Sequence, residues 1–447
     1  MKPYPKYKPS GIEWIGEIPE HWDIFLVRRI IKSHKQGFYS NEEYTQDGCK
    51  LLRITDIDDN SNIHLSDCPR VSISQKEYED YELQLNDFVF ARSGTIGRFG
   101  IYRDNNLEVI FASYLIRFRF EENISVDFLK NYFLSNIFRE GLISDLHGGA
   151  NKNIHAENIK NQIICLPSYA EQTAIANYLD RKTAQIDDLI AKKQRLIELL
   201  NEEKTALINR AVTKGLNPDA PLKDSDIPWL GEIPAHWEVI RLKWIADINP
   251  SKGSSSFDKN SNELVTFLPM EKVSEDNSFD NSLKKPICEL WSGFTYFEEG
   301  DVIVAKITPC FENGKGALLE KLGSNIGFGS TEFHVLRASQ NVQRKFLFYL
   351  TRTELFKNMG EALMYGAAGQ KRVPTSYLEE YVMALPPIEE QDLIVHHIEA
   401  NLSRITDTIS KIQREIDLLQ EYRTALISEA VTGKIDVRDE AIEWQKI

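Results

Sequence analysis

The chain has 447 residues, a formal net charge of −14 and a sequence pI near 5.3. This length suggests two to four domains, and the acidic balance argues at first sight against nucleic acid as a partner. Five cysteines without CxxC spacing indicate neither a zinc knuckle nor a dithiol redox motif, and they fit a reducing compartment. The first residues lack the apolar segment of a signal peptide, and no apolar run approaches the roughly 20 residues of a membrane span. We therefore expect a soluble, cytoplasmic protein.

One peptide occurs twice in the chain. WIGEIPEHW occupies residues 14–22 and WLGEIPAHW occupies 229–237. A second pair of segments, 166–213 and 385–432, aligns without a gap and opens with LPSYAEQ and LPPIEEQ. Between these anchors NDFVFARSGTIGRFG (86–100) parallels GDVIVAKITPCFENGKG (300–316), and GANKNIHAENIKNQIICLP (149–167) parallels AGQKRVPTSYLEEYVMALP (368–386). Two copies are too few for a solenoid, so the duplication predicts a protein with pseudo-twofold symmetry.

The regions between the repeated anchors vary and have mixed α and β character. LQLNDFVFA, SYLIRFRF and GDVIVAKI have strand-like patterns, whereas VDFLKNYFLSNIFREGL and RKFLFYLTRTELFKNMG have the pattern of amphipathic helices. In SYLIRFRF an apolar face alternates with a face that carries Arg117 and Arg119. We interpret these arginines as a solvated sheet face, with DNA contact as the alternative.

The segments after LPSYAEQ and LPPIEEQ have the heptad pattern of long paired helices. The second seam consists of Ile398, Leu402, Ile405, Ile409, Ile412, Ile416 and Leu419, and the first of Ile186, Ile190, Ile197, Leu200 and Leu207. Lys193 and Glu203 interrupt the first seam. A helix from residue 171 to residue 212 would be about 63 Å long. If the two helices were parallel, the second variable region would have to span that length, so we expect antiparallel pairing.

The predicted fold is therefore α+β, with two mixed α/β domains in a pseudo-twofold arrangement, joined by two long helices that form an antiparallel coiled coil. The predicted segments are an N-terminal junction (1–22), a first variable domain (23–165), a central helix (166–216), a linker with the repeated junction (217–237), a second variable domain (238–384), a C-terminal helix (385–435) and a tail (436–447).

This arrangement resembles the specificity subunit of type I DNA restriction–modification systems. The resemblance covers essentially the whole chain and rests on the GEIPEHW and GEIPAHW peptides, the LPSYAEQ and LPPIEEQ openings, and the duplicated order of variable region and helix. It implies that each variable domain is a target recognition domain for one half of a split DNA sequence, and that the helices hold the two domains at a fixed separation.

The resemblance also implies the partners and cofactors. A specificity subunit of this family has no catalytic site and no cofactor of its own. It binds double-stranded DNA and two methylation subunits, which use S-adenosylmethionine. Motor–nuclease restriction subunits, which need ATP and Mg²⁺, join this complex, and no membrane is involved.

The sequence contains none of the enzyme motifs that these partner activities require. It has no [DN]PP[YF] loop of a methyltransferase and no GxxxxGK[ST] phosphate loop. The string EEK at 202–204 lies on a predicted helix and is interpreted as a solvated face. We interpret His21 and His236 as structural residues, because no nucleophile or metal-ligand set accompanies them. We interpret the tryptophans at positions 14, 22, 229 and 237 as packing residues.

The acidic charge is concentrated outside the variable domains. Residues 23–165 contain 17 basic and 21 acidic side chains, and residues 238–384 contain 17 and 19. Each domain is therefore close to neutral and can carry a basic patch on one side.

Two loops recur at matching places and are the candidates for DNA contact. Loop 1 carries Arg92, Ser93, Thr95 and Arg98 in the first domain and Lys306, Thr308, Asn313 and Lys315 in the second. Loop 2 carries Asn151, Lys152 and Asn153 in the first domain and Gln370, Lys371 and Arg372 in the second. Arg can read guanine, Asn and Gln can pair with adenine, and Lys can bind phosphate. For loop 1, a glycine-rich turn with solvated charges is the alternative.

The sequence thus predicts a non-catalytic, sequence-specific DNA-binding subunit of a type I restriction–modification complex. The alternative is a coiled-coil scaffold that bridges two protein partners and does not bind DNA. The repeated Lys- and Arg-bearing loops favour the first hypothesis, and the acidic balance favours the second.

Overall fold

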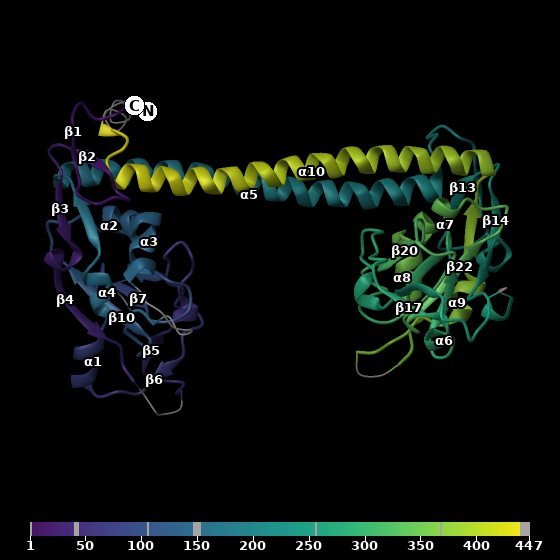
Figure 1. The fold of residues 1–447 in the computed structure, drawn as a ribbon, viewed down its shortest axis with the longest axis horizontal. Coiled ribbons are helices and arrows are strands. Elements are labelled where there is room, and N and C mark those ends of the chain that lie inside the picture. The colour runs from purple at the N-terminus through teal and green to yellow at the C-terminus, as the bar shows by residue number, and fades with distance from the viewer. Residues whose placement is uncertain are drawn as a thin grey trace. The chain divides into compact units, whose positions relative to one another are not determined.

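The structure is a computed structural model that describes residues 2–39, 44–104, 107–145, 153–254, 257–366 and 369–438. The chain forms two compact units (Figure 1). Unit 1 contains the residues up to Lys193 and those from Gln413 onwards, and unit 2 contains Gln194–Ile412. We call residues 23–166 head 1 and residues 238–385 head 2.

Unit 1 contains three small sheets and one larger one. Its strands are β1 (Tyr7–Pro9), β2 (Glu17–Pro19), β3 (Asp23–Leu26), β4 (Ile31–Gln36), β5 (Cys49–Leu52), β6 (Arg70–Val71), β7 (Phe88–Ala91), β8 (Phe99–Ile101), β9 (Val109–Phe111), β10 (Leu115–Phe120) and β11 (Ile163–Leu166). The larger sheet has the antiparallel order β4-β10-β7-β8, and a three-stranded sheet has the order β6-β5-β9, with β5 and β9 parallel. The pairs β1-β2 and β3-β11 complete the unit.

Unit 2 repeats this plan. Its strands are β12 (Leu222–Asp224), β13 (Glu232–Pro234), β14 (Glu238–Arg241), β15 (Ala246–Ile248), β16 (Leu264–Leu268), β17 (Lys284–Pro286), β18 (Thr295–Glu298), β19 (Val302–Ala305), β20 (Gly316–Leu318), β21 (Ile326–Gly329), β22 (Phe333–Ala338) and β23 (Val382–Leu385). The sheet β15-β22-β19-β20 corresponds to β4-β10-β7-β8, and β17-β16-β21-β18 corresponds to β6-β5-β9 with one added strand. The pairs β12-β13 and β14-β23 again complete the unit.

Short helices cover these sheets. They are α1 (Gln75–Tyr81), α2 (Val126–Leu134), α3 (Asn136–Asp145) and α4 (Ala156–Lys160) in unit 1, and α6 (Ile287–Leu290), α7 (Arg344–Thr351), α8 (Glu354–Ala362) and α9 (Thr375–Glu380) in unit 2. Short 3-10 helices lie at Val27–Ile30, Ile54–Asp56, Leu242–Trp244, Lys252–Ser254 and Met270–Lys272.

Each amphipathic helix expected from the sequence is in fact two helices. The first pattern breaks at Ser135, between α2 and α3, and the second breaks before Thr353, which caps α8. The Thr353 hydroxyl accepts the Phe356 amide at 3.3 Å, and the Ser135 hydroxyl accepts the Phe138 amide at 3.4 Å. A side chain that caps a new helix in this way ends the preceding one, and hydrophobic periodicity alone does not detect it.

The two long helices predicted from the heptads are present. They are α5 (Tyr169–Lys214) and α10 (Ile388–Val431). In unit 1, Lys193 of α5 pairs with Glu415 of α10, and Asp187 pairs with Arg423 at 2.8 Å. Residue numbers therefore rise along one helix as they fall along the other, so the helix segments of unit 1 are antiparallel. Within the described residues, no helix is long and apolar enough to span a membrane.

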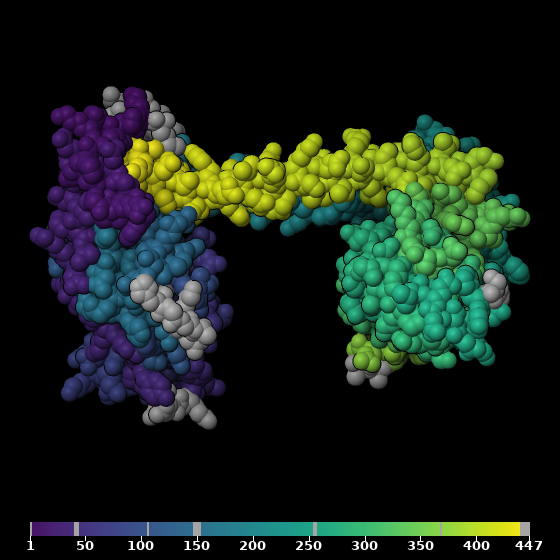
Figure 2. Space-filling model, viewed as in Figure 1, coloured from purple at the N-terminus to yellow at the C-terminus, as the bar shows by residue number. Residues whose placement is uncertain are grey.

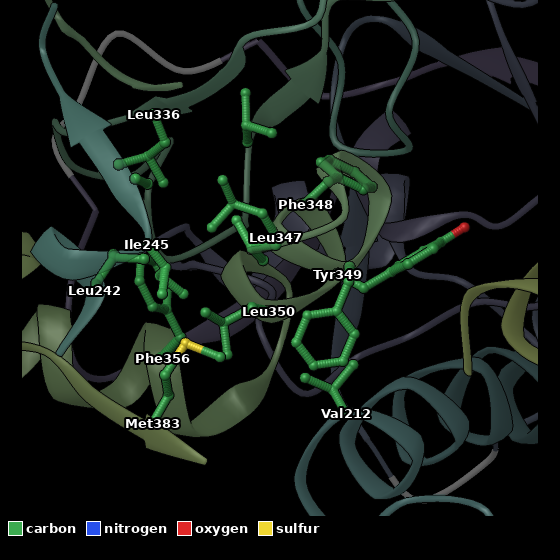
Figure 3. Packing of buried hydrophobic residues seen from close by; sticks show 14 of the residues in the cluster. Val212, Leu242, Ile245, Leu336, Leu347, Phe348, Tyr349, Leu350, Phe356 and Met383 are labelled. Carbon is green, nitrogen blue, oxygen red and sulfur yellow. The ribbon is translucent and has the colours of Figure 1, made fainter. Parts of the chain in front are cut away.

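Unit 2 places the other ends of the same helices in one hydrophobic cluster with head 2. Ala211 and Val212 of α5 and Ile394 and Ile398 of α10 are all buried in it. Figure 3 shows Val212 together with side chains of α7 and the strands of head 2. Head and helices thus share a core.

The repeated peptide anchors each head to the first turn of a long helix. In unit 1 the Trp22 indole N–H donates to Oε1 of Glu171 at 3.2 Å, and Nε2 of His21 lies 3.0 Å from Oε2 of the same carboxylate. Trp22 and Glu171 are buried. In unit 2 Trp237 and His236 make the same contacts with Glu390, at 3.2 and 2.7 Å.

The glutamine that follows each of these glutamates binds the head. The side-chain oxygen of Gln172 accepts a hydrogen bond from the Ser125 backbone amide at 2.8 Å, and the side-chain oxygen of Gln391 accepts one from the Gln343 backbone amide at 2.8 Å. The side-chain NH₂ group of each glutamine also donates to the backbone carbonyl of a proline just before the helix. The Glu-Gln pair of each repeat therefore joins peptide, helix and head.

The packing interpretation holds for only two of the four repeated tryptophans. Trp22 and Trp237 are fully buried. Each ring packs closely against a glycine: a Cβ added to Gly433 would lie 3.2 Å from the Trp22 ring, and a Cβ added to Gly215 would lie 3.2 Å from the Trp237 ring. Trp14 and Trp229 instead expose 55% and 47% of their surface. His21 and His236 are held by glutamates, as a structural role requires.

The N-terminal segment of unit 1 packs against the segment that follows α10 (Figure 2). Lys2 and Asp436 form a β-bridge, and the Lys434 ammonium donates to the Glu17 carbonyl at 2.5 Å. Tyr4 packs edge-on against Trp22 at 5.9 Å between ring centroids. The segment that follows α10 is therefore part of the junction of head 1.

We predict that Trp22→Phe destabilises unit 1 more than Trp237→Phe destabilises unit 2. Each change removes the indole donor and keeps an aromatic ring. Glu171 exposes 6% of its side chain and loses a donor that water cannot replace, which costs about 1–3 kcal/mol. Glu390 exposes 26%, so water can take the place of its lost donor. Urea denaturation with hydrogen exchange in each unit measures both costs, and equal costs would contradict this account.

Candidate nucleic-acid interface

Loop 1 connects a central strand of the larger sheet to the neighbouring edge strand in each head. In head 1 it runs from Arg92 to Arg98, between β7 and β8, and in head 2 it runs from Lys306 to Lys315, between β19 and β20. Gly94 and Gly97 have φ angles of 88° and 78°, a left-handed conformation that favours glycine. The turn therefore favours glycine at these two positions of ARSGTIGRFG.

In both heads the structure brings the residue that directly follows loop 2 to the start of loop 1. The Ile154 amide donates to the Arg92 carbonyl at 2.7 Å, and the Val373 amide donates to the Lys306 carbonyl at 2.8 Å. In head 2 the Thr308 amide also donates to the Lys371 carbonyl at 3.0 Å. Segments about 60 residues apart thus form one surface, and equivalent backbone hydrogen bonds hold it in each copy.

The candidate side chains of head 1 differ in their surroundings. Arg92 is half-buried and reaches the Ser113 carbonyl at 3.4 Å, and Ser93 is also half-buried. Thr95 and Asn153 are exposed. Arg98 donates to Asp59 at 2.6 Å. Asn151 and Lys152 lie outside the described residues.

In head 2 the loop 1 side chains Lys306, Thr308 and Lys315 are half-buried, and Asn313 is exposed. The Thr308 hydroxyl donates to the Lys371 carbonyl at 3.3 Å, and the Lys315 ammonium donates to the Met270 carbonyl at 3.3 Å. Asn313 donates to Glu275 at 2.9 Å.

The loop 2 side chains of head 2 include two exposed residues, Gln370 and Lys371. Arg372 is half-buried and pairs with Glu332, with Nη2 2.8 Å from Oε1. This guanidinium holds the pKa of Glu332 below its ordinary value.

Two acidic residues that the sequence did not single out fix loop 1. Asp59 binds Arg98, and Glu275 binds Asn313. They lie in matching loops that follow a short 3-10 helix, and each loop contains a residue with positive φ, Ser61 at 67° or Asn277 at 77°. These carboxylates neutralise or orient loop 1 side chains, so Arg98 and Asn313 are less available to DNA than Lys371. The alignment of the two copies could have identified the matching loops, but not their contact with loop 1.

The sequence analysis missed a second pair of residues of this surface, one in each head. Tyr114 precedes β10 and Glu332 precedes β22, and their carbonyls accept the amides of Arg92 and Lys306 at 2.9 and 2.8 Å. Tyr114 exposes 63% of its surface and, with exposed Tyr39 and Tyr44, lines a groove of about 800 Å³. The two heads therefore share one backbone frame and present different chemistry at this place.

The interpretation of Arg117 and Arg119 as a solvated face is wrong. Arg117 exposes 7% of its side chain and donates to the Glu82 carbonyl at 2.7 Å. Arg119 donates to buried Asp87 at 2.8 Å. In head 2, Arg337 and buried Asp301 form the corresponding pair at 2.8 Å. This side of the sheet is covered, so the arginines are structural and lie away from the candidate surface.

Among the described residues, no group of three or more His, Cys, Asp or Glu side chains could hold a metal ion. The described part of this surface carries amide, hydroxyl, guanidinium and ammonium groups, together with the carboxylates of Asp59, Glu275 and Glu332.

The comparison with protein families now identifies the class of protein. The model of the type I restriction modification DNA specificity domain matches residues 19–199 and again residues 234–418. The chain therefore belongs to this family, with one match per repeat.

Individual relatives agree with this class. The chain is 32% identical to the type I restriction enzyme EcoAI specificity subunit of Escherichia coli, over 56% of this chain but only 42% of that relative. It is 26% identical to the putative type I restriction enzyme MjaX specificity subunit of Methanocaldococcus jannaschii, over 95% of this chain and 96% of that relative. A chain from a structural study of assembly and conformational transition in the type I R-M system has a similar fold, with a TM-score of 0.65 at 16% identity over 94% of this chain and 99% of that chain.

We predict that Asp87→Asn destabilises head 1 by about 3–5 kcal/mol, because it leaves two arginines without their buried counter-charge. DNA sequence preference should not change in the molecules that remain folded, because the pair lies away from loops 1 and 2. Thermal unfolding measures the change in stability, and a binding selection measures the change in sequence preference. Lys32→Ala, at an exposed site, is the control in both experiments. A changed preference at normal stability would show that this face contacts DNA.

Proposed function

We propose that this chain is the specificity subunit of a type I restriction–modification complex. It is non-catalytic, and each head reads one half of a bipartite DNA target. The observation that carries the proposal is the paired surface of loop 1 and loop 2, built by equivalent backbone hydrogen bonds in two heads that belong to a DNA specificity family.

The side chains of this surface suit contact with DNA. Exposed Lys371 and half-buried Arg92 and Lys306 bring positive charge to phosphates, which supplies affinity without sequence information. Asn153, Gln370 and Arg372 have the hydrogen-bonding groups that distinguish base pairs in the major groove. Because the polar residues differ between the heads, we infer that the two half-sites differ in sequence.

The long helices set the separation of the half-sites in this proposal. Antiparallel pairing in unit 1, and the shared cluster of the end of α5 with the start of α10 in unit 2, support one continuous antiparallel coiled coil, with the heads in a pseudo-twofold arrangement. The 46 residues of α5 correspond to about 69 Å of helix. A rod of this kind fixes how many base pairs stay unread between the half-sites.

The repeat also explains the proposed stoichiometry of the partners. Exposed apolar side chains occur on both long helices, at Leu189, Leu196, Leu199, Leu393 and Leu418, and half-exposed Trp14 and Trp229 mark the two junctions. Leu199 and Leu418 occupy corresponding positions of the two repeats, as do the two junction tryptophans, and this correspondence suits two methylation subunits. The S-adenosylmethionine of methylation, and the ATP and Mg²⁺ of restriction, belong to the methylation and restriction subunits in this proposal.

Exchange of one head tests the proposal. Replacement of residues 238–384 by the matching region of a relative should change one half of the methylated sequence and keep the other half and the spacer, because the repeated anchors remain. Methylome sequencing of a host that expresses the chimera with its methylation subunits reads both halves, and replacement of residues 23–165 is the matched control. A wholly new or undivided motif would contradict the proposal, and a stable complex that methylates no specific sequence would favour a protein scaffold.

A further inference from the structure

The Arg372 guanidinium of head 2 is held in place from several sides. Its Nε donates to both carboxylate oxygens of Glu332, at 3.2 and 2.9 Å, and Nη2 donates to Oε1 at 2.8 Å. The Arg372 amide donates to the Tyr365 carbonyl at 2.8 Å, and the Tyr365 amide donates back at 3.1 Å. Both the backbone and the head group of this arginine are therefore fixed before any ligand arrives.

The carboxylate occupies one side of the guanidinium and leaves its end available. Arginine has five N–H groups in a planar fork, and Glu332 uses Nε–H and one N–H of Nη2. The Gln370 carbonyl accepts from Nη1 at 3.4 Å, which is long for a hydrogen bond. One N–H on each Nη still points along the end of the fork. The side chain exposes 38% of its surface, so this end can reach a ligand.

Head 1 carries different groups at the same two places. In the aligned repeats Asn153 stands where head 2 has Arg372, and Tyr114 stands where it has Glu332. Asn153 is exposed and Tyr114 exposes 63% of its surface. Head 1 thus combines an amide and an aromatic ring where head 2 has an ion pair.

We propose that Arg372, oriented by Glu332, reads a guanine in the half-site of head 2, and that head 1 reads a different base with Asn153 at the equivalent place. This inference rests on the proposed function. The end of the guanidinium matches the O6 and N7 acceptors of guanine in the major groove, whereas adenine presents a donor at the position of O6. Glu332 is a positioning residue, because its oxygens face the arginine.

The neighbouring cations complete the assignment. Lys371 is exposed and adjacent in sequence, and half-buried Lys306 lies on the strand side of the same surface. An ammonium on a flexible stem suits a phosphate, whereas a fixed planar fork suits a base edge. A carboxylate without a counter-charge here would repel the phosphates of DNA, and Arg372 supplies that counter-charge to Glu332.

The test is a binding selection with the complete chain and its methylation subunits on DNA with randomised half-sites. Arg372→Ala should lower the preference for guanine at one position of one half-site by roughly 5- to 150-fold and leave the other positions unchanged. Arg372→Lys keeps the charge but lacks the fork, so it should lose the same preference at near-normal overall affinity. Glu332→Gln should weaken the guanine preference less than Arg372→Ala does.

Two controls separate specificity from affinity and from folding. Lys371→Ala should weaken binding to all sequences about equally and lower the slope of log affinity against log salt by about one unit. Asn153→Ala should affect only the other half-site. Melting temperatures show whether each variant is folded.

The outcomes distinguish the inference from the function on which it rests. If folded Arg372→Ala and Arg372→Lys select the same bases as the parent chain, or lose affinity equally for every sequence, Arg372 does not read a base and the inference is wrong, while the proposed function stands. If the parent complex selects no sequence, the proposed function itself fails.

Discussion

The structure depends on one carboxylate in the first turn of each long helix, which is buried at Glu171 and partly exposed at Glu390. Glu171 accepts the indole N–H of Trp22 and contacts His21, and Glu390 does the same for Trp237 and His236. A negative charge in the first turn of a helix is also favoured by the helix dipole. Because the next residue binds the head through its side-chain amide, the direction of the helix and the position of the head are fixed together.

This shared frame allows the two heads to differ where they meet a ligand. The frame includes the pairs Asp87–Arg119 and Asp301–Arg337 and the backbone bonds between loops 1 and 2, which recur in both copies. The exposed positions do not recur, since Tyr114 corresponds to Glu332 and Asn153 to Arg372. Such a division lets binding preference change by substitution at the surface without a cost in packing, as a family of DNA specificity domains requires.

Much of this could be predicted from the sequence, because repetition and periodicity are local signals. The heptads predicted α5 and α10, and the glycines and polar residues of loops 1 and 2 identified the candidate surface. The sequence could not predict that the Ile154 amide meets the Arg92 carbonyl, because that contact depends on strand order. It also failed at Arg117, since alternation along a strand separates two faces but does not tell which face is covered. The Glu332–Arg372 pair joins residues 40 positions apart and leaves no local pattern.

We propose that anchored heads on paired helices set the spacing of the two half-sites. Seven residues inserted after Lys193 and seven after Arg414 lengthen both helices at the level of the Lys193–Glu415 pair and keep the heptad seam in register. The insertion adds about 10 Å of helix, which corresponds to about three base pairs at roughly 3.4 Å each. Each added pair also rotates the second half-site by roughly 35°. Binding selection on DNA with randomised spacers should therefore show a longer preferred spacer at reduced affinity. A folded insertion variant that still prefers the original spacer would contradict the account, because something other than the helices would then position the heads.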